Sequence, residues 1–202
     1  LAMPESSAQR AERLNQAEAA LQQAALLSND SGITYFHMYK LHRARGETGE
    51  SLKYLNLALD RAPGDGDLSG ELVPVLRERG RLAVLNRDYR EGVADYSTAS
   101  RLRPGDVDLQ MDLASALLLL AESREFSAAE RDSSYREAGR VLEEIRRLRP
   151  LEPDALYNLA TVRIRVQDYS GAGDLLLHYL ALRPRDPEAW RLLSTQLRTY
   201  VN

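Results

Sequence analysis

The chain of 202 residues carries 27 basic and 30 acidic side chains, three histidines and no cysteine. Its net charge of −3 gives no general attraction to nucleic acid or to an anionic membrane, and the lack of cysteine excludes disulfides, zinc–thiolate sites, iron–sulfur clusters and a cysteine nucleophile. The longest apolar run, Leu117–Ala121, is too short to cross a bilayer, so we expect a soluble protein without direct membrane insertion.

Alanine, leucine, glutamate, glutamine and arginine dominate the composition, which favours helices over strands. Lys40 and Lys53 are the only lysines, and this arginine bias is typical of GC-rich coding, so we expect a bacterial source. The chain starts at Leu1 without a basic-then-apolar leader, so we expect that any targeting segment was removed or never existed. The bacterial cytoplasm and the periplasm both stay open as compartments.

The first expected element is a helix within residues 1–31. Its apolar residues recur every three or four positions and form one stripe, which comprises Leu14, Ala17, Leu21, Ala24 and Leu27. A helix with one apolar stripe needs a neighbour to cover it, so we interpret this segment as a half unit or a cap of a helical array.

Residues 32–65 are the first of four units that share one register. Each unit is expected to fold as a helix, a tight turn and a second helix that stops at a proline, because proline lacks the N–H that a further turn needs. These prolines are Pro63, Pro104, Pro150 and Pro184. At fixed distances before them stand a small and a large apolar residue, namely Ser51 and Leu55, Gly92 and Tyr96, Ala138 and Leu142, and Ala172 and Leu176.

Residues 66–72 exceed the repeat period, and we expect an inter-repeat insertion there in the form of a polar loop. The segment Asp65–Gly70 matches the opening of an EF-hand calcium loop, with oxygen donors at alternate positions. Leu76 stands where the closing glutamate belongs, so ordinary turn chemistry is the preferred interpretation and no metal is expected.

The second and third units cover residues 73–106 and 107–150. The third unit contains an insertion near 118–134, which either lengthens its turn or extends both of its helices. Arg79 in the second unit and Arg163 in the fourth stand at normally apolar positions. We expect both side chains to pack their stems and to extend their guanidinium groups to water.

The fourth unit covers residues 153–186, and a further helix over 187–202 follows as a half unit or cap. In the fourth unit the segment Asp154–Ala160, the turn Gln167–Tyr169 and Pro184 together resemble a tetratricopeptide repeat of standard length. The shared register extends this resemblance to nearly the whole chain. It implies an all-α fold, namely a right-handed α-solenoid of helix-turn-helix units with half-repeat helices at its ends.

No catalytic or cofactor-binding pattern stands out. His37 and His42 lie about 140° apart around a regular helix and so cannot chelate one metal ion. His42 occupies a position that this repeat usually fills with a packing aromatic side chain, so a structural role is expected. No serine lies in a nucleophile elbow and no glycine-rich segment has phosphate-loop spacing, so we expect neither enzymatic activity nor a cofactor.

The resemblance places the partner-binding surface on the concave side of the array, which the first helices of the units line. Residues beside the packing stripe of each first helix are expected to point into this groove. These candidates are Phe36, His37, Lys40, Arg43, Arg77, Arg81, Met111, Asp112, Ser115, Tyr157, Asn158, Thr161 and Arg165.

Within this set we expect three apolar anchors, which are Phe36, Met111 and Tyr157. The basic members are expected to form a local basic patch, which comprises Lys40, Arg43, Arg77 and Arg81. Some members of the family hold a peptide's terminal carboxylate with a clamp of Lys, Asn and Arg side chains. The resemblance puts other residue types at those positions, so this clamp is not expected; they are Phe36, Lys40, Glu78, Asp108 and Asp112.

The leading hypothesis is a bacterial adaptor, a protein-interaction scaffold that holds an extended peptide or a partner helix in its groove. One alternative is a self-associating segment of a longer solenoid, stacked through its end helices, in envelope assembly, secretion or polysaccharide export. Another is an accessory region of an enzyme whose catalytic domain is absent. Acidic residues interleave with the arginines of Glu143–Arg149, so nucleic acid is not an expected partner.

Overall fold

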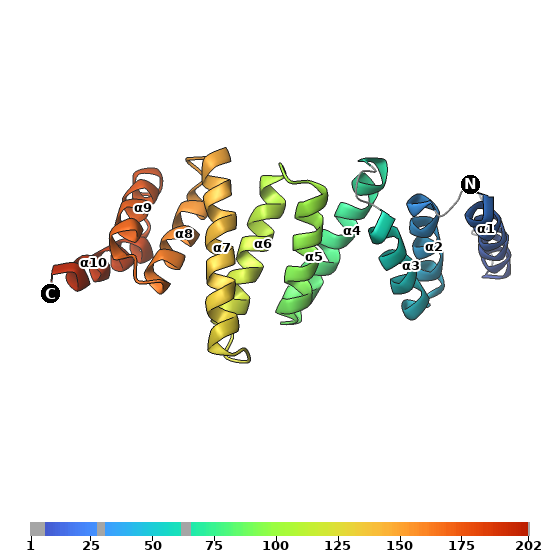
Figure 1. Cartoon of the computed structure of the whole chain (residues 1–202), viewed down its shortest axis with the longest axis horizontal. Coiled ribbons are helices and arrows are strands. Elements are labelled where there is room, and N and C mark those ends of the chain that lie inside the picture. The colour runs from blue at the N-terminus through green and yellow to red at the C-terminus, as the bar shows by residue number, and fades with distance from the viewer. Residues whose placement is uncertain (1–6, 28–30, 62–65, 202) are drawn as a thin grey trace. The chain divides into compact units, whose positions relative to one another are not determined.

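The computed structural model describes residues 7–27, 31–61 and 66–201, and these residues form ten helices and no strand (Figure 1). The expected all-α solenoid class is thereby confirmed. The chain divides into two compact units, Leu1–Val75 and Leu76–Asn202, and the boundary lies inside α4 (Gly66–Leu85). Pro74 lies just before this boundary and has no N–H to donate within the helix.

The first unit contains α1 (Ser7–Leu27), α2 (Gly32–Arg45), α3 (Thr48–Arg61) and the first part of α4. Helices α2 and α3 form a hairpin. Gly46 ends α2 with a φ of 78°, and its N–H donates to the carbonyl of Arg43 at 3.1 Å. This left-handed conformation is strained for any residue with a Cβ, which explains the glycine.

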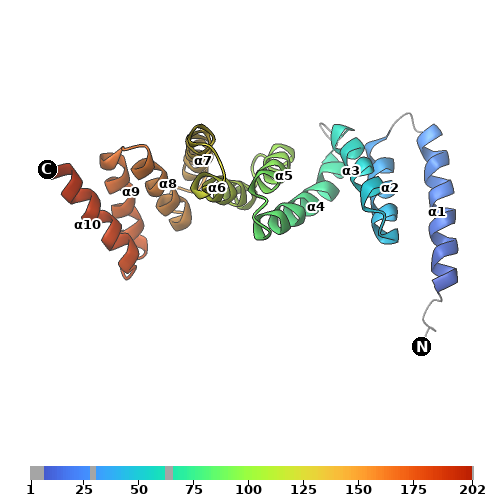
Figure 2. The same cartoon turned by 90° about the horizontal axis from the view of Figure 1, so that it is seen from below.

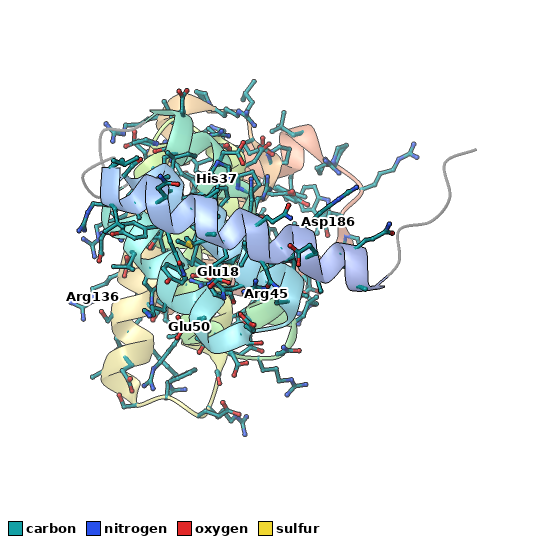
Figure 3. All side chains as sticks on the ribbon, turned by 90° about the vertical axis from the view of Figure 1, so that its right-hand side faces the viewer. Glu18, His37, Arg45, Glu50, Arg136 and Asp186 are labelled. Atoms are coloured by element: carbon teal, nitrogen blue, oxygen red, sulfur yellow. The ribbon has the colours of Figure 1, made fainter. Side chains whose placement is uncertain are left out.

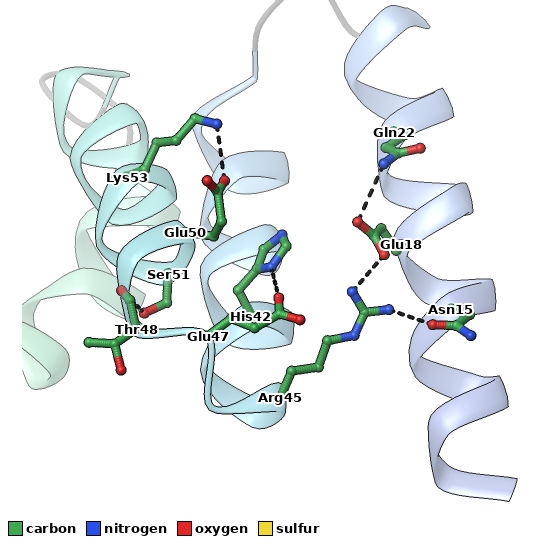
Figure 4. A network of polar contacts seen from close by, with 10 residues as sticks. All are labelled: Asn15, Glu18, Gln22, His42, Arg45, Glu47, Thr48, Glu50, Ser51 and Lys53. Atoms are coloured by element: carbon green, nitrogen blue, oxygen red, sulfur yellow. Dashed lines mark hydrogen bonds and ion pairs between the residues drawn. The ribbon is translucent and has the colours of Figure 1, made fainter. Parts of the chain in front are cut away.

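The contact between α1 and α2 depends on polar side chains. Glu18 and Arg45 lie next to one another (Figure 3), and Arg45 donates to Glu18 at 2.6 Å and to Asn15 at 2.7 Å (Figure 4). The apolar stripe of α1 is only partly covered, since Leu14 is half-buried and Leu27 is 79 % exposed. Helix α1 therefore packs less tightly than α2 and α3 do on each other.

Residues 66–72, expected as a polar loop, are instead the first two turns of α4. Leu68 and Leu72 are fully buried, and a Cβ on Gly32 would lie 2.4 Å from the Leu68 side chain, so α2 and α4 pack closely here. Asp65 lies outside the described residues. From Gly66 onward, alternate side chains point to opposite sides of the helix, so oxygen donors at alternate positions cannot converge on a calcium ion.

The second unit contains the rest of α4 and six further helices. These are α5 (Tyr89–Leu102), α6 (Val107–Glu122), α7 (Ala128–Leu148), α8 (Pro153–Arg165), α9 (Tyr169–Leu182) and α10 (Pro187–Val201). Successive helices lie side by side in chain order (Figures 1 and 2), and one apolar core extends from Tyr96 in α5 to Leu193 in α10. No hairpin covers its own apolar surface, so each depends on its neighbours.

Small residues permit the close approach of α4 and α5 within this unit. A Cβ on Gly92 would lie 2.6 Å from Cγ2 of Val84 and 3.2 Å from the carbonyl oxygen of Gly80. Alanines take the same role in later hairpins, and all of them are fully buried; they are Ala114, Ala138, Ala160 and Ala172.

The insertion near 118–134 extends the helices rather than the turn. Helix α6 continues to Glu122 and α7, with 21 residues, begins at Ala128. Ser127 caps α7 by accepting from the Glu130 N–H at 3.3 Å, and the Glu130 carboxylate accepts from the Ser127 N–H at 3.0 Å. The start of α7 consequently reaches beyond α8 (Figure 1).

The arginines at apolar positions form ion pairs instead of extending freely into water. Arg79 donates to the buried carboxylate of Asp95 in α5, with Nε 2.6 Å from Oδ2. Arg163 lies 2.7 Å from Glu143 in α7 and 3.0 Å from Asp168 at the start of α9. Each guanidinium thus links neighbouring helices, because the partly buried charge requires an opposite charge nearby.

Candidate functional site

A groove of about 600 Å³ lies in the second unit between α6, α8 and α10. Three successive first helices of the hairpins form it, on the side where the resemblance predicts a partner surface. The groove brings together five of the predicted residues, Ser115, Tyr157, Asn158, Thr161 and Arg165. These five are the part of the predicted site that the structure assembles in one place.

The floor of the groove is apolar, and the sequence prediction missed the residues that form it. They are Leu118, Leu119, Ile164 and Leu192. Leu119 is 39 % exposed although it lies in the middle of a helix. The sequence did contain a signal for an exposed leucine here. Four consecutive leucines, Leu117–Leu120, point in all directions around a helix, so one of them must lie outside the packing stripe and face outward.

Polar groups on α8 and α6 point into the same groove. Thr161 Oγ1 is satisfied by the carbonyl of Tyr157 at 3.1 Å. Within the described part of the chain, the Asn158 amide and the Ser115 hydroxyl have no hydrogen-bond partner. An amide with a free donor and a free acceptor can bind the backbone of an extended peptide.

Tyr157 is held firmly at the edge of the groove. Its ring centroid lies 5.2 Å from that of Tyr179 in α9. Burial raises the pKa of Tyr157 above its usual value, and the nearby carboxylates of Glu188 and Asp186 add to the effect. The hydroxyl therefore stays protonated at neutral pH and acts as a neutral group.

Charges of both signs flank the apolar floor. Arg165 lies 6.0 Å from the Tyr135 ring centroid, and Glu122 lines the groove near it. Glu188 accepts from Arg191 Nε at 3.0 Å, and this hydrogen bond lowers the pKa of Glu188. The groove as a whole is apolar with balanced charge rather than basic.

Four predicted residues of the second unit lie outside this groove, namely Arg77, Arg81, Met111 and Asp112. Met111 is half-buried and packs against the apolar core. The Asp112 carboxylate accepts from Arg77 Nε at 2.6 Å, and this hydrogen bond raises the pKa of Arg77. Arg77 and Asp112 satisfy one another, which leaves neither charge free for a partner.

The predicted residues of the first unit include one clear error. Phe36 is 0 % exposed, so it cannot be an anchor for a partner; it belongs to the core of α2, and its ring lies 5.7 Å from that of Tyr39. His37, one position further, is exposed. Arg43 is also exposed and donates to the Tyr39 hydroxyl at 3.0 Å.

The expected basic patch is largely neutralised by ion pairs. Lys40 Nζ lies 2.8 Å from Glu71 and 4.4 Å from the centroid of the Phe36 ring. Arg81 pairs with Glu78 at 2.8 Å, which adds to the pairing of Arg77 described above. Acidic neighbours thus cancel the positive field that these residues would need to attract an acidic ligand.

His42 has the structural surroundings that its position predicts. It is 6 % exposed, its ring stacks on Tyr54 at 5.0 Å, and Nδ1 lies 2.5 Å from a Glu47 oxygen.

Among the described residues, no cluster of three His, Cys, Asp or Glu side chains is arranged for a metal ion. None of the described helices is long and apolar enough to span a membrane.

A model of the tetratricopeptide repeat family matches residues 129–195. No curated protein sequence matches the chain. Among solved structures, the Arabidopsis OM64 TPR domain is 18 % identical and has a TM-score of 0.55, with 65 % of this chain and 98 % of that domain covered.

The second TPR domain of human RPAP3 was solved in complex with the HSP70 peptide SGPTIEEVD. It is 17 % identical to this chain, with a TM-score of 0.53, and the match covers 63 % of this chain and 97 % of that domain. The MamA protein is 13 % identical with a TM-score of 0.54, covering 84 % of this chain and 82 % of that one. These structures share the helical hairpin fold of this chain, and residues 129–195 carry the sequence pattern of the tetratricopeptide repeat.

Proposed function

We propose that the chain is a protein-interaction scaffold that binds a peptide segment of its partner in the groove between α6, α8 and α10. The observation that carries the proposal is an exposed apolar floor beside an amide without a hydrogen-bond partner among the described residues. Apolar side chains of the peptide would supply affinity on the floor, and Asn158 would bond its backbone. In a bacterium, such a scaffold would serve as an adaptor.

The human RPAP3 domain supports the proposal because it has the same fold and is solved with a peptide. Its peptide ends in the sequence EEVD, which has three acidic residues, whereas the groove of this chain carries Glu122 and Glu188 as well as Arg165. We therefore expect apolar anchors, rather than a carboxylate clamp, to determine the preferred peptide.

A peptide selection with matched variants tests the proposal. Phage-displayed random dodecapeptides are selected on the whole chain, and the affinity of selected peptides is measured by fluorescence anisotropy. Leu119→Glu places a charge on the groove floor and should weaken binding at least tenfold. Leu177→Glu, at a leucine of α9 that is 54 % exposed and outside the groove, should change it less than twofold. Equal affinity of both variants, or a selection without enriched peptides, would contradict the proposal.

Self-association is a second candidate, favoured by two leucines at the end of α1. Leu26 is 87 % exposed and Leu27 is 79 % exposed, so neither is covered within its unit. Light scattering over a range of concentrations should show a dimer that Leu26→Glu with Leu27→Glu dissociates. A monomer at the highest concentration would remove this candidate.

A further inference from the structure

A second groove, of about 560 Å³, lies between α7 and α8 and shares no residue with the first. Its floor is apolar, with Leu159 and Val162 of α8 almost fully buried and Val166 49 % exposed at its mouth. Gly139 lets α7 approach α8 closely beside this floor, because a Cβ there would lie 3.3 Å from the Val162 side chain. Helix α8 thus lines one groove on each of two faces.

Charged residues at one end of this groove are paired with each other. Glu143 accepts from Arg163 at 2.7 Å and from Arg146 Nε at 2.9 Å, and Glu144 pairs with Arg147. These pairs leave no net charge for a ligand, so this end of the groove contributes only its shape.

The other end carries two arginines without a carboxylate partner among the described residues. Arg136 and Arg140 lie one turn apart on α7, are exposed and line the groove. Arg136 donates only to the backbone carbonyl of Asp132, at 3.2 Å, and its side chain points outward from α7 (Figure 3). Two exposed guanidinium groups beside an apolar floor fit a ligand that is acidic and aliphatic at once.

We propose that this second groove binds an acidic peptide segment in which aliphatic and acidic residues alternate. Side chains one helical turn apart are separated by about 6 Å. Alternate residues of an extended peptide are separated by about 7 Å, so two successive acidic side chains match Arg136 and Arg140. The aliphatic residues between them then face the apolar side of the groove, where Val166 is exposed. A uniformly charged polyanion offers no aliphatic side chain to the apolar part of the groove, so a peptide is favoured over nucleic acid.

Fluorescence anisotropy with three synthetic peptides tests the proposal on the whole chain. The fluorescein-labelled peptide SGELDLEGS should bind, and it should bind at least tenfold more tightly than SGKLKLKGS, whose charge is reversed, or SGESDSEGS, which lacks the leucines. Weaker binding at higher salt is also expected, because the ion pairs are exposed. No binding of the first peptide up to millimolar concentration, or tighter binding of a labelled thymidine decanucleotide, would overturn the proposal.

Matched variants locate the binding. Arg136→Glu with Arg140→Glu should weaken SGELDLEGS at least tenfold, whereas Arg124→Glu with Arg185→Glu, an equal charge change at exposed arginines elsewhere, should change it less than twofold. Val166→Glu is a second test variant. Its position at the mouth of the groove is exposed, so the substitution should leave the fold intact and should also weaken the binding of SGELDLEGS. Leu119→Glu, on the floor of the first groove, should leave the affinity for SGELDLEGS unchanged. This result would show that the two grooves are separate binding sites. Equal loss in the two double variants would contradict the assignment.

Discussion

Three turn residues in the described chain have a left-handed backbone conformation, and only one of them is a glycine. Gly46 has a φ of 78°, Arg87 of 68° and Gln167 of 65°. Each lies in the turn that joins the two helices of a hairpin. A residue with a Cβ is strained by about 1–2 kcal/mol in this conformation.

Replacing one of the strained residues by glycine should therefore stabilise the protein. Gln167→Gly and Arg87→Gly should each raise the free energy of unfolding, by about 0.5–1 kcal/mol, because the relief of strain exceeds the added flexibility of the unfolded chain. Urea denaturation measures the change. Gly46→Ala is the reverse experiment and should destabilise the protein; a stabilised Gly46→Ala variant would contradict the strain argument.

The residue scale also shows which site residues the sequence could predict. Tyr157, Asn158 and Thr161 were predictable because the fourth unit follows the repeat closely and its register fixes their orientation. Phe36 was assigned to the wrong face, since a helix turns about 100° per residue and one position decides between core and surface. The pairing of Arg77 with Asp112 joins residues 35 positions apart, and a periodic pattern carries no information on such a contact.

At the scale of the element, the carboxylate of Glu130 stabilises the first turn of α7. Glu130 accepts from the Ser127 hydroxyl at 2.7 Å and from the Ser127 N–H, and it also pairs with Arg90 of α5. These hydrogen bonds lower the pKa of Glu130 to about 2. Because the folded pKa is lower than the unfolded one, the stabilisation is complete above pH 4.5 and is lost as the pH falls toward 2.

This linkage predicts a pH-dependent loosening of α7. Amide hydrogen exchange in its first turn should accelerate, beyond the intrinsic pH effect, as the pH is lowered from 5 to 2. Glu130→Gln cannot titrate, so its first turn should show the same protection throughout this range. Titration of the folded Glu130 carboxylate by NMR with a pKa near 4.5 would show that the capping arrangement does not form.

The contact of α4 with α5 gives a second prediction for an element. Gly92→Ala should destabilise the protein by about 1–3 kcal/mol, because the new methyl group overlaps Val84 and this cost exceeds the gain in helix propensity. Gly173→Ala in α9 is the matched control, since no atom lies within 4 Å of its added Cβ. That variant should be stabilised by up to about 1 kcal/mol. Similar thermal denaturation of both variants would contradict the close packing of α4 and α5.

Elements were predictable wherever proline stops and apolar spacing agreed, which was the case for most hairpins. The segment 66–72 was assigned to a loop because its glycines and aspartates are typical of turns. Leu68 and Leu72 gave the opposite signal, since they lie four residues apart as on one face of a helix. Burial of these leucines outweighs the weak local preference of the glycines, so tertiary packing decided the outcome.

At the scale of the whole molecule, the stability of each hairpin depends on the hairpins next to it. In the second unit each helix packs on its chain neighbours, so the free energy of any hairpin depends on the one before and the one after. A defect in the middle of this unit should therefore weaken nearby helices more than distant ones. In a globular core in which every element contacts every other, the same defect would weaken all helices equally.

A cavity at the centre of α7 distinguishes these two behaviours. Leu142 is 0 % exposed, and Leu142→Ala should cost about 2–5 kcal/mol because the lost packing leaves a cavity. Amide exchange should then accelerate most in α6, α7 and α8 and least in α10, at the far end of the stack. Leu177→Ala, at a leucine that is 54 % exposed in α9, should change protection by less than about 0.5 kcal/mol anywhere. An equal loss of protection from α5 to α10 in Leu142→Ala would mean that the second unit unfolds as one cooperative body, which would contradict the hairpin-by-hairpin account.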